Sequence, residues 1–231
     1  LQLGELRLEV DLGGEYGPLA LVGPNGSGKT TLLRTIAGAY RPQSGKIQVS
    51  GRTVIDSKRG LDIPPEDRHV GYVPQGYGLF PHLSVIDNVA FGWISRIPRR
   101  TRAERRQAAM KLLEQVGCAH LARRLSTTLS GGEQQKIALA RALTTEPEIL
   151  LLDEPLAALD APAKKSIRSY LTTHLQERNG PSIVVSHDAR DVMSLGAEVC
   201  VIEHGHIVQR GAAAALRANP KTEFIEAFFE A

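Results

Sequence analysis

Gly23-Pro24-Asn25-Gly26-Ser27-Gly28-Lys29-Thr30 match the phosphate-binding pattern G-x-x-x-x-G-K-[ST], and most of the fold prediction rests on this segment. It follows a continuous apolar run at residues 19–22, typical of a strand buried on both faces, and precedes a predicted helix over residues 30–39. The glycines allow backbone N–H groups to surround phosphate oxygens, and the positive end of the helix dipole faces the same anion. A glycine-rich structural turn is the alternative, but a chance match has odds on the order of one in a hundred.

Two further apolar runs end in polar residues. Residues 149–152 are followed by Asp153 and Glu154, and residues 183–185 are followed by Ser186 and His187. Polar residues just past the C-terminal ends of buried strands lie where an open α/β sheet places its ligand. Asp153 and Glu154 can divide the work, since one carboxylate binds a metal and the other polarises an attacking water. His187 can donate to a γ-phosphate oxygen, although a lone histidine there is more often a buried, satisfied side chain.

A second glycine-containing segment, Ser130-Gly131-Gly132, precedes a strong helix former at residues 137–143. Ser130 is a plausible N-cap, and the glycine pair allows close backbone approach at the helix N-terminus. Taken alone, the segment predicts only a capped helix. Beside a phosphate loop, it predicts a second phosphate-binding surface.

The composition fits a globular domain, with 42% apolar and 23% charged residues in 231 and a net charge of +3. No apolar run approaches the roughly 18–20 residues that a membrane-spanning helix needs. Cys118 and Cys200 show no paired spacing for a metal or disulfide framework, so a reduced, cytosolic setting is expected.

The positive charge is concentrated in residues 95–124, which hold nine arginines and lysines against two glutamates. A solvated helix face is the first interpretation. Binding to an anionic membrane surface is the second, since each basic residue near such a surface gains roughly 1 kcal/mol of binding free energy. Nucleic acid is the last, because no recognition signature accompanies the arginines.

The hydrophobic pattern predicts an α/β fold with a mainly parallel sheet. Short strands are expected at residues 6–10, 47–49 and 53–55, a helix at 162–177, a hairpin around Gly205 and a helical tail at 223–229. Residues 85–145 have a helical pattern. We therefore expect one domain, with a core of residues 1–84 and 146–231 and a helical subdomain of residues 85–145.

The order of these motifs resembles that of the ATP-binding-cassette ATPases. The resemblance rests on the loop at residues 23–30, Gln75, LSGGE at 129–133, ILLLDEP at 149–155, Ala157-Ala158-Leu159-Asp160, and His187. It covers nearly the whole chain, and LSGGE beside a phosphate loop is highly specific to that family. It implies a P-loop NTPase core with an N-terminal antiparallel β lobe and a helical subdomain insertion.

The resemblance also implies the site residues. Glu154 would be the catalytic base, His187 the switch histidine and Gln75 the lid glutamine. Mg²⁺ would be bound by Thr30, Gln75 and Asp153. The ATP-binding residues would be Gly23, Pro24, Asn25, Gly26, Ser27, Gly28, Lys29, Thr30, Thr31, Ser130, Gly131, Gly132 and Asp160. Ser130, Gly131 and Gly132 would contact the γ-phosphate held by the opposite subunit, and Asp160 would lie in the loop that crosses the dimer interface.

Such ATPases close as head-to-tail homodimers around two ATP molecules. Residues 75–89 are similar to the segment that receives the permease's coupling helix in importers, although Tyr77, Leu79, Phe80 and Leu83 could instead be core. The resemblance implies an importer ATPase at the cytoplasmic face of the cell membrane, with permease subunits and, indirectly, a substrate-binding protein as partners. The N-terminal strand looks most like that of molybdate/tungstate ATPases, and ferric iron, polyamine and sugar importers are the alternatives.

An alternative of another class is a soluble cassette ATPase that acts on nucleic acid. Such relatives carry long coiled-coil arms or two cassettes in one chain, and neither fits 231 residues with a single loop and a single signature. No nucleic-acid partner is therefore expected. Many family members also append a C-terminal regulatory barrel, which the sequence to Ala231 does not include.

One departure concerns the nucleotide base. Family members usually stack adenine on an aromatic side chain in the N-terminal strand. Here the matching position is near Leu6, which offers only aliphatic contact, and Tyr16 is the only aromatic residue before Tyr40. We expect Tyr16 to lie on the wrong side of the following strand.

Overall fold

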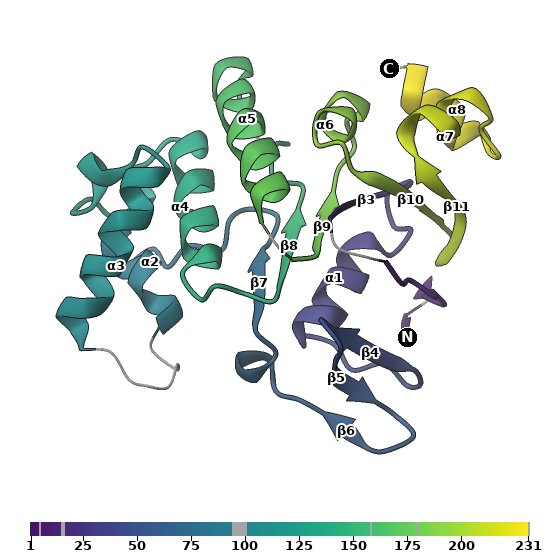
Figure 1. Cartoon of the computed structure of the whole chain (residues 1–231), viewed down its shortest axis with the longest axis horizontal. Coiled ribbons are helices and arrows are strands. Elements are labelled where there is room, and N and C mark those ends of the chain that lie inside the picture. The colour runs from purple at the N-terminus through teal and green to yellow at the C-terminus, as the bar shows by residue number, and fades with distance from the viewer. Residues whose placement is uncertain (5, 15–16, 94–100, 158, 179, 231) are drawn as a thin grey trace.

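The computed structural model describes residues 1–4, 6–14, 17–93, 101–157, 159–178 and 180–230. Its centre is a six-stranded sheet in the order β11-β10-β3-β9-β8-β7 (Figure 1). The strands are β3 (Pro18–Val22), β7 (Val70–Val73), β8 (Ile149–Asp153), β9 (Ser182–Val185), β10 (Glu198–Glu203) and β11 (His206–Ala212). Neighbouring strands are parallel, except that β11 pairs antiparallel with β10 through the predicted hairpin at Gly205. The predicted mainly parallel α/β sheet is confirmed.

The parallel strands are mostly apolar because helices cover both faces of the sheet. Successive side chains of a strand point to opposite faces, so Leu150 and Leu152 of β8 lie in one core cluster and Ile149 and Leu151 in another. The first cluster includes apolar side chains of α4 to α8, and the second includes those of α1. The covering helices are α1 (Lys29–Ala37), α4 (Gly131–Leu143), α5 (Ala161–Glu177), α6 (Ala189–Ser194), α7 (Ala213–Ala218) and α8 (Glu223–Glu230).

The antiparallel β lobe consists of a three-stranded sheet, β4 (Lys46–Val49), β5 (Arg52–Asp56) and β6 (Leu61–Asp62), and a small pair, β1 (Gln2–Leu3) and β2 (Leu6–Arg7). The predicted strand at residues 6–10 is wrong in extent, because only Leu6–Arg7 are in a strand. Beyond them the Leu8 N–H donates to Leu1 O, and the Glu9 N–H donates to Gly205 O at 2.9 Å. The Leu1 ammonium also donates to Leu8 O at 2.9 Å, so the pairing of β1 with β2 extends to Leu8, whereas Glu9 bonds to a different segment.

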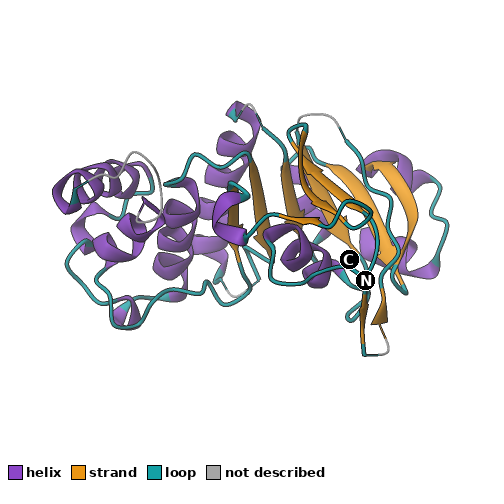
Figure 2. Cartoon of the chain, turned by 90° about the horizontal axis from the view of Figure 1, so that it is seen from below, coloured by secondary structure: helices purple, strands orange, loops and turns teal. Residues whose placement is uncertain are grey.

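The helical subdomain lies in the chain between β7 and β8 and at one end of the sheet (Figures 1 and 2). Its helices α2 (Val85–Ala90), α3 (Arg102–Gln115) and α4 enclose a third core cluster that includes Val85, Trp93 and Leu113. Short 3-10 turns occur at Pro65–Asp67, Phe91–Trp93, Ala119–Leu121 and Ser126–Thr128. We propose residues 85–145 as the subdomain of a single domain, since this segment has its own core.

No helix in the described part of the chain is long and apolar enough to cross a membrane. The basic segment 95–124 is partly engaged in local structure. The Arg106 guanidinium donates two hydrogen bonds to the Asp87 carboxylate, at 2.8 and 2.7 Å, and these hold the pKa of Asp87 down to about 2. Arg96, Arg99 and Arg100 lie outside the described residues. Arg102 and Lys111 of α3 are exposed, which favours the interpretation of this segment as a solvated helix face.

Arg68 is a buried cation that sequence reasoning missed. Its side chain is 2% exposed and donates to the carbonyl oxygens of Thr35 and Ile36, both at 2.9 Å, at the C-terminal end of α1. It also pairs with Asp62 at 2.8 Å. The last carbonyls of a helix have no partner within the helix, so Arg68 fixes the far end of the helix that follows the phosphate loop.

We expect Arg68→Met to lower the free energy of unfolding by about 3–5 kcal/mol, because it leaves Asp62 and two carbonyls without their buried partner. Urea denaturation measures this change. Arg41→Met is the matched control, since Arg41 pairs with the same Asp62 but its side chain is 70% exposed. The Arg41→Met control should lower the free energy of unfolding by less than about 1 kcal/mol. Equal losses in the two variants would contradict a special role for Arg68.

Candidate active site

The phosphate loop connects the end of β3 to the start of α1. Gly23, Gly26 and Gly28 have positive φ values of 154°, 77° and 107°, which side chains disfavour. A Cβ at Gly23 would lie 2.0 Å from Ile202 O, and a Cβ at Gly28 would lie 2.8 Å from a methyl carbon of Leu8. Backbone shape therefore favours glycine at both positions, and at Gly23 the fixed backbone of Ile202 also leaves no room for a side chain. Gly28 is the N-cap of α1 and supplies no side-chain cap, so the first N–H groups of the helix face the loop.

Lys29 places a positive charge inside this loop. Its side chain is largely buried, and its Nζ donates to the carbonyl oxygens of Gly23 and Pro24, both at 2.8 Å. Burial lowers the pKa of Lys29, while the charges of Glu154 and Asp153 oppose that shift. The ammonium thus lies inside the loop and interacts electrostatically with both carboxylates at the end of β8, where a phosphate would be bound.

Asp153 ends β8 and is 1% exposed. Its Oδ1 accepts from the Thr30 hydroxyl at 3.0 Å, and its Oδ2 accepts from the Tyr72 hydroxyl at 3.3 Å. Burial raises the pKa of Asp153, and both hydrogen bonds counteract that shift. A carboxylate beside a hydroxyl is an oxygen pair suited to Mg²⁺, which usually takes its remaining ligands from phosphates and water. No cluster of three or more His, Cys, Asp or Glu side chains that could hold a metal exists among the described residues.

Glu154 lies between two partners from neighbouring strands. Gln75 follows β7 and donates through its Nε2 to Glu154 Oε2 at 3.1 Å. His187 follows β9, and its Nε2 is 3.0 Å from Glu154 Oε1. Glu154 has a positive φ of 51°, a conformation that is uncommon for a side-chain-bearing residue and that clusters at functional sites. The carboxyl ends of β7, β8 and β9 therefore bring together the three predicted catalytic side chains.

The remaining predicted residues lie elsewhere in the subunit. Ser130 caps α4 and exchanges hydrogen bonds with Glu133, which forms a capping box. Asp160 caps α5, and its Oδ1 accepts from Ala163 N at 2.9 Å. Among the described residues, no hydrogen bond joins Ser130, Gly131, Gly132 or Asp160 to the phosphate loop at residues 23–31. Ala158, part of the segment that carries the family resemblance, is outside the described residues.

Tyr72 and Arg34 are site residues that sequence reasoning missed. The Tyr72 hydroxyl donates a hydrogen bond to Asp153. Hydrogen bonds with Tyr40 and Tyr72 raise the pKa of Arg34, which lies in α1. The position of Tyr72 near the end of a strand that precedes Gln75 was the available signal. Only the pairing of β7 with β8 shows that its hydroxyl reaches Asp153.

The apolar cluster after Gln75 divides between core and surface. Tyr77 and Leu79 pack against the main core cluster. Phe80 is half-buried, with its ring 4.5 Å from that of Phe91 and 5.3 Å from the Arg141 guanidinium. Phe91 is 43% exposed. The core interpretation therefore applies to Tyr77 and Leu79, and Phe80 with Phe91 forms a surface aromatic pair.

The comparisons with known proteins agree with this geometry. A model of the ABC transporter family matches residues 9–157, which includes the phosphate loop, Gln75, the signature segment and both carboxylates. The chain belongs to the ABC transporter family. It is 42% identical over 221 residues to a sulfate/thiosulfate import ATP-binding protein, CysA, of Synechococcus elongatus, covering 95% of this chain and 62% of that protein.

Other relatives in the ABC family are named for the import of different substrates. The molybdenum import ATP-binding protein ModC of Paramagnetospirillum magneticum is 40% identical, over 99% of this chain and 62% of that protein. The Fe(3+) ions import ATP-binding protein FbpC 2 of Pectobacterium atrosepticum is 41% identical, over 90% of this chain and 59% of that protein. The chain thus spans about three fifths of the length of these relatives.

Solved structures show the same fold. The dimeric post-hydrolysis state of the ATP-binding cassette MJ0796, bound to ADP and Pi, superposes with a TM-score of 0.78 at 26% identity, covering 92% of this chain and 94% of that chain. This likeness confirms the ABC ATPase fold predicted from the sequence, with its P-loop core, antiparallel β lobe and helical insertion.

Proposed function

We propose that this chain is the ATP-hydrolysing subunit of a membrane importer. The observation that supports it best is the placement of Glu154 between Gln75 and His187, beside the Thr30–Asp153 pair and the phosphate loop. The loop at residues 23–31 would bind the phosphates of ATP through backbone N–H groups and Lys29. Thr30, Asp153 and Gln75 would hold Mg²⁺, which neutralises charge that develops on the phosphate oxygens.

The chemical step is displacement at the γ-phosphorus. A water oxygen attacks, its proton passes to a Glu154 carboxylate oxygen, and the bond to the β–γ bridging oxygen breaks to give ADP and inorganic phosphate. Gln75 and His187 hold the two oxygens of Glu154 in place, one each. His187 would also donate a hydrogen bond to a γ-phosphate oxygen of bound ATP.

We propose that two copies complete the site. Ser130, Gly131, Gly132 and Asp160 have no hydrogen bond to their own phosphate loop within the described residues, which supports a role at the site of an opposite subunit. In a head-to-tail homodimer, the N-terminus of α4 would add its unpaired N–H groups and dipole to the γ-phosphate of the partner. The dimeric state of the MJ0796 cassette supports this arrangement.

The importer assignment rests on relatives that are named for import. Proteins named for sulfate/thiosulfate, molybdenum and Fe(3+) import match this chain at 40–42% identity. We propose permease subunits as direct partners, a substrate-binding protein as an indirect one, and the cytoplasmic face of the membrane as the location. For the cargo we propose an oxyanion, with molybdate or tungstate as first candidates and sulfate beside them.

Two measurements test this function. Purified chain should release phosphate from ATP only when Mg²⁺ is present, and chelation should abolish the release. In cells, the chain should co-purify with an integral membrane partner after detergent extraction. Recovery with polynucleotide at low salt, and no membrane partner, would instead support the nucleic-acid class.

Phe80 offers a test of permease coupling. We expect Phe80→Ser to reduce cargo uptake by the assembled transporter while ATP hydrolysis by the isolated chain stays within about twofold of the wild type. The lost aromatic pair with Phe91 should cost about 0.5–1.5 kcal/mol of stability in addition to the lost burial of the ring, which is only partial in the wild type. Leu79→Ser is the comparison, since Leu79 packs on the core and its change should lower the melting temperature more. Normal uptake by the Phe80 variant would contradict a docking role.

The aliphatic side chain of Leu6, in place of an aromatic one, leads us to expect weak selection between adenine and guanine. A Cβ at Gly28 would lie 3.7 Å from a Leu6 methyl carbon, so Leu6 is next to the phosphate loop, whereas Tyr16 is outside the described residues. Base–aromatic stacking is worth about 1–3 kcal/mol. We expect kcat/KM for GTP within about tenfold of that for ATP, since about 1.4 kcal/mol is one decade.

Leu6→Tyr should tighten ATP binding, as measured by titration with a fluorescent ATP analogue. Leu6→Met is the matched control, because it keeps an aliphatic side chain and should not change the affinity. A wild-type preference for ATP of about a hundredfold, roughly two decades of affinity, would contradict the prediction.

A further inference from the structure

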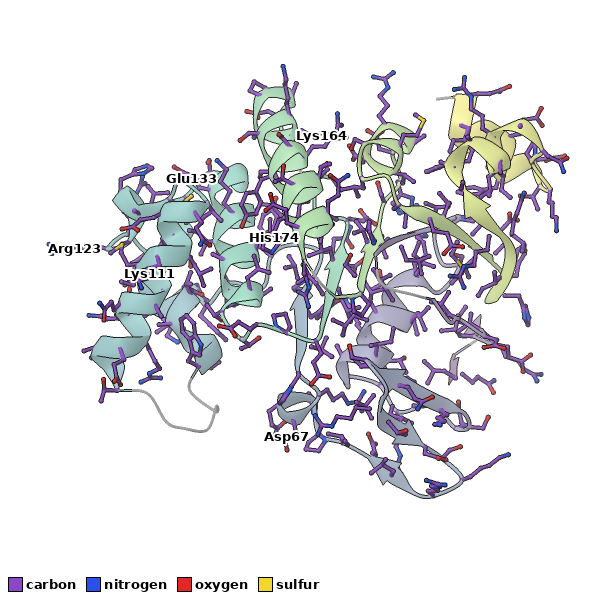
Figure 3. All side chains as sticks on the ribbon, in the orientation of Figure 1. Asp67, Lys111, Arg123, Glu133, Lys164 and His174 are labelled. Carbon is purple, nitrogen blue, oxygen red and sulfur yellow. The ribbon has the colours of Figure 1, made fainter. Side chains whose placement is uncertain are left out.

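The first turn of α5 contacts two functional segments at once. On one side it meets the signature segment, since a Cβ at Gly132 would lie only 3.0 Å from the Ala163 Cβ. Figure 3 shows Glu133 near the start of α4 and Lys164 near the start of α5, on the same side of the molecule. Gly132 is therefore packed directly against α5, with no room for a side chain between them.

On its other side the same turn contacts the segment that carries His187. Lys164 Nζ is 2.6 Å from Asp188 Oδ2 and 3.3 Å from Asp191 Oδ2. Asp188 is the residue after His187 and also caps α6, where its side chain accepts from Arg190 N at 2.8 Å. Only 24% of the Lys164 side chain is exposed, so this ion pair is partly shielded from water.

A cavity beside His187 makes the ion pair of Lys164 with Asp188 important for the position of His187. A cavity of about 240 Å³ lies between α5, α6 and the segment after β8, lined by Glu154, His187, Asp188 and Lys164 among others. His187 is therefore not held in place by dense packing on that side. Lys164 and Asp188 both line this cavity, and their ion pair ties the histidine segment to α5.

We propose that the Ala163–Lys164 turn is a positioning element that couples the two ATP sites of the dimer. The inference rests on the proposed function, in which His187 serves the subunit's own ATP and Gly132 serves the ATP of the partner. One rigid helical turn contacts both segments, so a displacement of His187 is transmitted through Lys164 and Ala163 to Gly132. Lys164 thereby acts on hydrolysis through His187, without touching the nucleotide.

Lys164→Met tests this, because it keeps the length of the side chain and removes the ammonium. We expect kcat to fall about tenfold, while the dissociation constant for a fluorescent ATP analogue stays within about twofold. The dependence of the rate on ATP should be sigmoidal in the wild type and hyperbolic in the variant, since coupling between the two sites is lost. Lys164→Arg restores a cation and should recover most of kcat.

Two controls separate positioning from stability. Lys165→Met removes an exposed charge on the next residue and should change nothing. Arg168→Met breaks the pair with Asp191 one turn further along α5 and should lower the melting temperature with little effect on kcat. Equal loss of kcat in the Lys164 and Arg168 variants, unchanged kinetics in Lys164→Met, or a hyperbolic wild type would overturn the inference alone. Absence of hydrolysis by the wild type would overturn the proposed function itself.

Discussion

Replacement of Glu154 by glutamine is expected to reduce kcat for ATP hydrolysis by about 10²–10⁴-fold, the range that a positioned general base contributes. The amide keeps the shape of the side chain, and its oxygen still accepts one hydrogen bond, from Gln75 or His187. What is lost is the carboxylate oxygen that takes the proton of the attacking water. Single-turnover measurements of phosphate release report this step directly.

Nucleotide binding should survive the same change. The Glu154→Gln variant is therefore expected to accumulate as an ATP-bound dimer, visible by size-exclusion chromatography in ATP and Mg²⁺. Glu148→Gln is a suitable control, because Glu148 pairs with His69 at 3.0 Å, away from the predicted catalytic side chains. A Glu154 variant that hydrolyses ATP at the wild-type rate would show that another group accepts the proton.

Lys29→Ala should act on binding rather than on the chemical step. A hydrogen bond from a charged group is worth about 1.5–3 kcal/mol, so loss of the ammonium should weaken ATP binding roughly 10- to 150-fold. The change also leaves the carbonyl oxygens of Gly23 and Pro24 without the donor they have now. Equilibrium titration with a fluorescent ATP analogue measures the affinity.

Lys46→Ala, at an exposed residue of β4, is the control for loss of a lysine. Thermal denaturation shows whether the Lys29 variant is still folded, which is needed before its affinity is interpreted. Wild-type affinity in a folded Lys29→Ala chain would contradict the placement of phosphate in this loop.

The segments that were predictable from the sequence are those in which local pattern and burial agree. The continuous apolar residues of β3, β8 and β9 predicted strands buried on both faces, and the structure has them in the middle of the sheet. The phosphate loop was predictable because glycine at residues 23 and 28 adopts positive φ values that other residues disfavour. At residues 6–10 the alternating pattern overstated the strand, since the pairing with β1 extends only to Leu8 and the Glu9 N–H donates to Gly205 O instead.

The sequence by itself determined which residues have the chemistry of this site: the glycine loop with Lys29, and the carboxylates and histidine that follow apolar strands. Only the tertiary structure decided which of them meet. Gln75, Glu154 and His187 are far apart in the chain and become neighbours because β7, β8 and β9 pair in parallel with their carboxyl ends together. The contact of Tyr72 with Asp153 depends on the same pairing of β7 with β8. The contacts of Arg68 with α1 and of Lys164 with Asp188 depend on other long-range packing. A local pattern reports which face of an element is buried, but the partner across that face is set by packing of the whole chain.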